Sequence, residues 1–149
     1  MKVAFIVFDN LTMLDFVGFQ DPIVRLRTMG YLPDLEWRVC AQTPEVTDGT
    51  GLRLKVDEIH QPLEGYDLIF IPGGMGTRSL KDDEEFIGWI RSATPCRYKV
   101  SVCTGSLILG AAGFLEGKNA ATHPAAYDLL AAYTPKVVRE RIVDEGDLI

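Results

Sequence analysis

The sequence has few of the residues that build metal sites or disulfide frameworks. Its 149 residues include only three cysteines, Cys40, Cys96 and Cys103, and only two histidines. No CxxC pair and no HExxH pattern occurs, so the sequence predicts neither a structural metal nor a disulfide scaffold. Thiols without such a framework are typical of a reducing environment, and we expect a cytoplasmic protein.

Excess positive charge and long apolar segments are also missing. The formal net charge is -6 and no basic run occurs, so we expect no nucleic-acid partner. No apolar stretch approaches the roughly 20 residues that a membrane-spanning helix needs, so we expect no membrane partner. The chain enters an apolar strand within its first residues, and we therefore expect no signal peptide.

What the chain does contain is an alternation of strand-like and helix-like segments. Nearly continuous apolar runs at residues 2–8 and 66–71 predict buried strands of a parallel sheet. Their alternation with amphipathic segments predicts one α/β domain over residues 1–149. In the first part of the chain we further expect a helix from Thr12 to Gly30 that Pro22 interrupts or kinks, a strand at 35–42, a hairpin at 44–60 and a helix at 82–90. After residue 119 we expect a short strand at 120–122 and a helix at 124–133 whose residues Tyr127, Leu130 and Ala131 face inward. The segment at 137–143 alternates between apolar and polar residues.

The end of the sequence resembles the beginning of a strand. Leu148 and Ile149 follow a predicted turn at residues 145–147. A doubly wound domain covers both faces of its sheet with helices, and only one helix is predicted after residue 122. We therefore expect a C-terminally truncated domain, without its last strand and helix.

One cysteine lies between a predicted strand and a predicted helix. The strand ends at residues 98–102 and the helix covers residues 105–112, with Cys103 at the junction. A thiol there lies beside the first free N–H groups of the helix, which predicts a nucleophile elbow and a lowered pKa. The alternative is a buried cysteine that acts as a small apolar residue.

Glycines follow the predicted strand at residues 66–71. Because Gly73 and Gly74 have no side chain, their backbone can approach a reacting group closely. The N–H groups of Gly74 and Met75, together with that of Thr104, are therefore candidates for an oxyanion hole. The alternative is an ordinary turn.

Two titratable residues are candidate proton carriers beside the thiol. Asp15 stands among the apolar residues Leu14, Phe16 and Val17, which is unusual for a surface aspartate. Burial of its carboxyl group would suit it to proton transfer. His123 follows the short predicted strand and is the other candidate base. The alternatives are a helix-capping or exposed aspartate and a structural histidine.

These residues together resemble the ThiJ/PfpI superfamily of flavodoxin-like, doubly wound domains, which is related to the class I glutamine amidotransferases. The likeness covers the whole chain, through Ile-Pro-Gly-Gly at 71–74, Ser-Val-Cys-Thr-Gly-Ser-Leu at 101–107 and Thr-His-Pro at 122–124. Within that group it is strongest to the isonitrile hydratase branch. The shared features are Leu14-Asp15 followed by Gly18, and the segment that begins at Cys103.

This resemblance implies a mechanism. Cys103 would attack the terminal carbon of an R–N≡C substrate to form a thioimidate, Asp15 would handle protons and activate water, and Thr104 would support the intermediate or Asp15. Gly73 and His123 would be accessory residues. The resemblance further implies a small-molecule substrate, no metal or organic cofactor, and a homodimer.

Two positions depart from the branch, and two other functions stay open. Phe19 stands where a proline is typical, and Pro124 where a tryptophan is typical, so both are candidates for lining a different substrate pocket. The same domain resembles the ligand-sensing half of transcription regulators, although no helix-turn-helix is present here. Glyoxalase or stress-response members of the superfamily generally have glutamate in place of Asp15. Thr104 disfavours a protease, since proteases of the group usually have histidine there.

Overall fold

The computed structural model describes all 149 residues, and a parallel sheet forms its centre. Five strands lie in the order β5-β2-β1-β6-β7, and every neighbouring pair is parallel. This arrangement confirms the predicted α/β class and places all the strand carboxyl ends on one edge. The strands are β1 (Lys2–Ile6), β2 (Glu36–Ala41), β5 (Glu58–Ile59), β6 (Leu68–Ile71) and β7 (Tyr98–Ser101).

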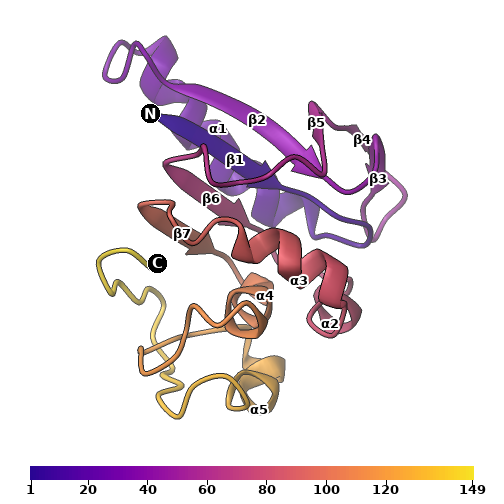
Figure 1. The fold of residues 1–149 in the computed structure, drawn as a ribbon, viewed down its shortest axis with the longest axis vertical. Coiled ribbons are helices and arrows are strands. Elements are labelled where there is room, and N and C mark those ends of the chain that lie inside the picture. The colour runs from indigo at the N-terminus through magenta and orange to yellow at the C-terminus, as the bar shows by residue number, and fades with distance from the viewer.

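Helices cover both faces of this sheet, as a doubly wound fold requires. Figure 1 shows α1 (Met13–Thr28) behind the sheet and α3 (Glu84–Arg91) in front of it. The short α2 (Thr77–Leu80) and α4 (Gly105–Ala111) pack together near α3. Because both faces are covered, β1 and β6 are buried along nearly their whole length, which explains why both read as apolar runs.

The residues before α3 and α1 differ in whether their side chains cap the helix. The side chain of Asp83 accepts a hydrogen bond from the N–H of Phe86, so this residue caps α3 as the acidic run predicted. Thr12 precedes α1 but makes no side-chain capping bond. Of the two outcomes expected at Pro22, an interruption or a kink, the interruption does not occur, because α1 continues through this residue to Thr28.

A small hairpin lies outside the main sheet, where the sequence predicted one. Strands β3 (Glu45–Thr47) and β4 (Arg53–Lys55) pair antiparallel. The carboxylate of Asp48 accepts hydrogen bonds from the N–H groups of Thr50 and Leu52, at 2.8 and 2.9 Å. This side chain therefore sets the turn between the two strands.

The last third of the chain differs most from expectation. The strand predicted at 120–122 and the alternating segment at 137–143 share a single bridge, between Ala120 and Val137. The predicted helix at 124–133 is a 3-10 turn, η1 (Pro124–Ala126), followed by one helical turn, α5 (Tyr127–Leu130). Ala126 and Leu130 are the buried residues here, whereas Tyr127 is half-buried and Ala131 is exposed. Alternation predicts a strand only where a sheet edge is available to pair with it.

The outer edge of β7 pairs with the last residues of the chain. Leu148 forms a parallel bridge with Lys99, and the N–H of Ile149 donates to the carbonyl of Lys99 at 3.0 Å. Figure 1 shows this end beside β7. The start of a strand predicted at these two residues therefore corresponds to real pairing. No helix has the length and apolar character needed to cross a membrane.

Candidate active site

The predicted elbow is present at Cys103. This residue directly follows β7 and Val102, it precedes α4, and its φ is +56°. A side chain in this left-handed region costs roughly 1–2 kcal/mol relative to ordinary helical backbone. Surrounding contacts must therefore hold the strain, which is characteristic of functional turns.

Three residues to which the sequence assigned no separate role hold this elbow. The hydroxyl groups of Ser106 and Thr122 both donate to the carbonyl of Cys103, each at 3.1 Å. A Cβ atom built on Gly105 would lie 2.3 Å from the carbonyl oxygen of Ile71, so glycine is needed where α4 approaches β6. Ser106, Thr122 and Gly105 all lie within the sequence motifs at 101–107 and 122–124, and this position was the feature of the sequence that could have indicated their role.

Asp15 and Cys103 meet at Gly73. The N–H of Gly73 donates to Asp15 Oδ2 at 3.1 Å. A Cβ atom on Gly73 would lie 2.7 Å from that oxygen, 2.7 Å from Cys103 Cβ and 2.9 Å from Cys103 Sγ. The carboxyl ends of β1, β6 and β7 are adjacent in the sheet, so the segments that follow them bring these three residues together.

Replacing Gly73 by alanine is expected to destabilise the protein, because the added methyl group would overlap both Asp15 and Cys103. We expect the free energy of unfolding, measured by urea titration, to fall by about 1–3 kcal/mol. Gly88→Ala is the matched control, since Gly88 lies in α3 with no atom near its Cβ position. That substitution should stabilise by about 0.5–1 kcal/mol. Equal effects of the two substitutions would contradict the close approach.

The side chain of Thr104 fixes the position of the glycine loop, residues 73–76, through contacts to Gly74. Its hydroxyl accepts from the N–H of Gly74 at 3.1 Å and lies 3.2 Å from the carbonyl oxygen of the same residue. The N–H of Gly74, one of the expected oxyanion-hole donors, is therefore engaged within the protein. The N–H of Thr104 lies against the sulfur of Cys103, whereas that of Met75 directly follows the antiparallel bridge between Leu11 and Gly74. These two remain the candidate donors.

The environment of the thiol differs from the expected one. Burial raises the pKa of Cys103 above its ordinary value, and the Asp15 carboxylate adds to the rise. The backbone N–H and hydroxyl of Thr104 oppose it without cancelling it. The predicted lowering is therefore wrong, because desolvation and a nearby negative charge outweigh the N–H groups at the start of α4.

His123 borders the site but is exposed. Its Nδ1 accepts a hydrogen bond from the N–H of Ala125 at 3.2 Å and thereby caps η1. The same residue lines a cavity together with Cys103. In this arrangement His123 has a structural contact through one nitrogen, while Asp15 is the titratable group that contacts the thiol.

The cavity beside Cys103 measures about 430 Å³. Most of its lining residues are hydrophobic, and nearly all belong to the last third of the chain. The exception is Phe19 of α1, which lines the cavity as expected for a position that departs from the isonitrile hydratase branch. Pro124, the other such position, does not line the cavity. The cavity can therefore present the half-buried thiol to an apolar ligand, whereas Asp15, which contacts the thiol, is not part of the lining.

The other two thiols are unlike Cys103. Cys40 and Cys96 are both buried. Burial raises the pKa of Cys40 to about 11 and that of Cys96 in the same direction. Neither lines the cavity. No group of three or more histidine, cysteine, aspartate or glutamate side chains is arranged to hold a metal ion.

Comparison with known proteins extends this description. The chain is 39% identical to "Isonitrile hydratase" of Pseudomonas putida, over 99% of this chain and 63% of that protein. The crystal structure of a ThiJ/PfpI family protein from Pseudomonas syringae superposes with a TM-score of 0.83 at 29% identity, over 99% of this chain and 60% of the other. An AraC family transcriptional regulator from Pseudomonas putida shares the fold, with a TM-score of 0.79 at 19% identity over 99% of this chain and 80% of the other.

The chain thus spans about three fifths of the first of these relatives. The model of the DJ-1/PfpI family matches residues 1–149, which is the whole chain. This match agrees with the parallel sheet and with the strained cysteine at its carboxyl edge. The protein belongs to the DJ-1/PfpI family.

Proposed function

We propose that the protein hydrates isonitriles to N-substituted formamides, with Cys103 as nucleophile. The observation that carries this proposal is the meeting of Asp15 and Cys103 over Gly73, with the thiol of Cys103 lining a largely apolar cavity. The 39% identity to an isonitrile hydratase supports the same reaction class. The homodimer expected from the resemblance stays a prediction.

The first step forms a bond between Cys103 Sγ and the terminal carbon of R–N≡C. Because the pKa of the thiol is raised, the resting group is the thiol, and Asp15 takes its proton as the sulfur attacks. The attack breaks one carbon–nitrogen π bond and leaves an electron pair on the terminal carbon. Asp15 then delivers the same proton to that carbon, which gives a thioimidate, R–N=CH–S.

The second step adds water to the thioimidate carbon. Asp15 accepts a proton from the water and passes it to the nitrogen, so the intermediate is R–NH–CH(OH)–S. The C–S bond then breaks, the hydroxyl proton returns to the sulfur through Asp15, and R–NH–CHO leaves. No net proton is gained or lost, and both residues return to their starting states.

Backbone N–H groups are expected to stabilise the charge that develops during these steps. The candidates are those of Met75 and Thr104, and that of Thr104 already lies against the sulfur of Cys103. One such donor is worth about 3 kcal/mol in well-measured cases. Thr104 also holds Gly74 in place through its side chain, so it supports the loop that carries the second donor.

The test is formamide production by the purified protein. We expect turnover of an isonitrile such as cyclohexyl isonitrile, detected by mass spectrometry of the formamide. In water labelled with heavy oxygen, the product should carry one labelled atom. Absence of formamide would overturn the proposal. Methylglyoxal, assayed in parallel for lactate, tests the glyoxalase alternative, which predicts the reverse pattern.

A further inference from the structure

A second pocket lies at the same edge of the sheet as Cys103. Its volume is about 180 Å³, and it shares no lining residue with the cavity beside Cys103. We propose that this second pocket binds a small organic cation, an alkylammonium ion whose charged head lies at Asp9 and whose alkyl chain lies on an apolar floor. This inference goes beyond the proposed hydratase function and does not depend on it.

The place of the second pocket in the fold favours a ligand there. The chain passes from β1 outward to β2 and β5, and then returns to β6 on the other side of β1. In open α/β sheets, ligands bind beyond the carboxyl ends of the strands, where the order of the strands reverses in this way. The lining consists of residues that follow β1, residues at the end of β2, and parts of the β3, α2 and α3 segments.

Asp9 supplies the only charged side chain in this lining. Its Oδ1 accepts a hydrogen bond from the N–H of Thr47 at 2.8 Å, so β3 fixes the orientation of the carboxylate. The basic residue next in the chain to the lining residue Leu80 is Lys81, which is paired with Asp82 at 2.6 Å. Because no lysine, arginine or histidine lines the second pocket, its charge favours a positively charged ligand.

The floor of the second pocket is apolar and its outer wall is polar. The rings of Phe8 and Phe86 are buried and meet edge to face, with centroids 6.1 Å apart. The amide of Gln42 and the hydroxyl groups of Thr43 and Ser79 belong to the more exposed part of the lining. Burial of an alkyl chain on the floor is favourable, and the oxygens of the outer wall can accept the hydrogens of an ammonium head.

The volume sets the size of the ligand. About 180 Å³ is the space of about six water molecules at roughly 30 Å³ each. This is below the usual range for drug-sized ligands, so the second pocket suits a short chain with one charged head. Butylammonium is of this size, whereas a nucleotide or a peptide is not.

The experiment is a titration of the isotope-labelled wild-type protein with butylammonium chloride, followed by the amide NMR signals. We expect the signals of residues 7–10, 41–43 and 76 to shift, and the same shifts in the Cys103→Ala protein. Butan-1-ol, measured at the same signals, should bind at least about fivefold more weakly, because it lacks the charge that pairs with Asp9. Equal affinities, or no shift at these residues, would overturn the proposal. Formamide production is not part of this readout, so failure of the hydratase function leaves the result unaffected.

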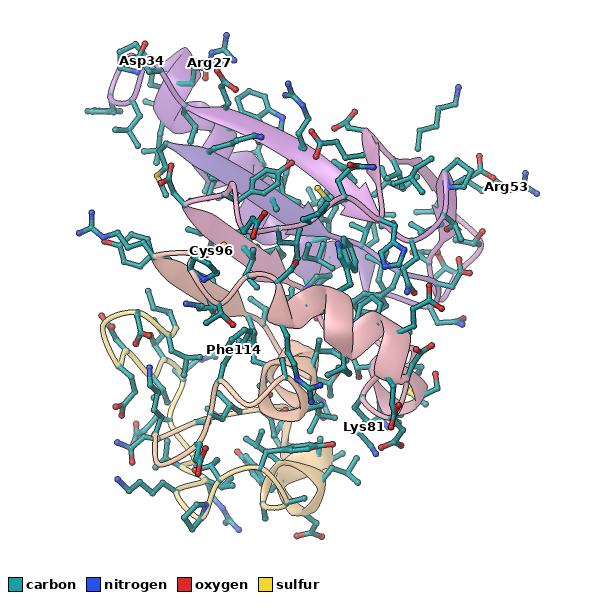
Figure 2. The ribbon with its side chains drawn as sticks, in the orientation of Figure 1. Arg27, Asp34, Arg53, Lys81, Cys96 and Phe114 are labelled. Carbon is teal, nitrogen blue, oxygen red and sulfur yellow. The ribbon has the colours of Figure 1, made fainter.

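Asp9→Asn tests the charged head. This variant should bind butylammonium at least about fivefold more weakly and butan-1-ol as before, and asparagine can still accept the N–H of Thr47. Asp34→Asn is the matched control, because Asp34 is an exposed aspartate outside the second pocket (Figure 2). Ser79→Leu, which fills the second pocket, should weaken the binding of both compounds and decides if Asp9→Asn does not fold. Unchanged butylammonium binding in either folded variant would overturn the proposal.

Discussion

Cys103→Ala is expected to abolish formamide production, with a loss of at least about a thousandfold in kcat/KM. The reaction requires a bond to sulfur, and no other thiol lines the cavity. The fold should survive, because alanine keeps the Cβ atom and the backbone contacts of the elbow. Those contacts come from Ser106 and Thr122, which bond to the carbonyl of residue 103 rather than to its side chain.

The control for this experiment lies in the same chain. Cys40→Ala and Cys96→Ala remove buried thiols that do not line the cavity, and Figure 2 labels Cys96. Both variants should keep the wild-type kcat/KM, although each is expected to lose stability through the cavity that it leaves. Turnover by Cys103→Ala that equals turnover by the two controls would show that Cys103 is not the nucleophile.

Asp15→Asn is expected to lower two measured quantities, the hydration rate and the pKa of the Cys103 thiol. The hydration rate should fall about a hundredfold or more, because asparagine cannot carry protons between sulfur, carbon and water. The pKa of the Cys103 thiol should fall as well. Burial is the larger cause of its raised value and remains, but the carboxylate that adds to the rise is gone. The thiolate therefore becomes more populated at neutral pH.

Thiol alkylation as a function of pH measures that second effect. The rate of alkylation by iodoacetamide should rise with pH in both proteins, and the midpoint of the rise should lie lower for Asp15→Asn. Asparagine can still accept the N–H of Gly73, so this contact is retained. Asp21→Asn, in the same helix but paired with Arg25 at the surface, is the matched control and should move neither measurement. A midpoint unchanged by Asp15→Asn would contradict the electrostatic contact.

Local sequence indicated the main strands and helices of the first two thirds of the fold, although α1 continues through Pro22 and the short helix α2 was not predicted. Buried parallel strands β1 and β6 show as apolar runs because both of their faces are covered. The elbow at Cys103 was predictable from a strand end, one cysteine and a glycine that opens a helix. The segment at 137–143 alternates in the same way as a strand, yet it makes a single bridge, between Val137 and Ala120. Pairing is a property of neighbours in space, so alternation by itself does not establish a strand there.

The sequence by itself determined the α/β class, the strained turn at Cys103 and the residue types that could perform its chemistry, because these depend on neighbouring residues in the chain. Only the tertiary structure decided that Asp15 and Cys103 meet at Gly73, that the N–H of Gly74 is engaged by Thr104, and that Phe19 lines the cavity. It also reversed the expected direction of the thiol pKa. Desolvation and charge at one sulfur atom depend on every segment packed around it, and those segments come from distant parts of the sequence.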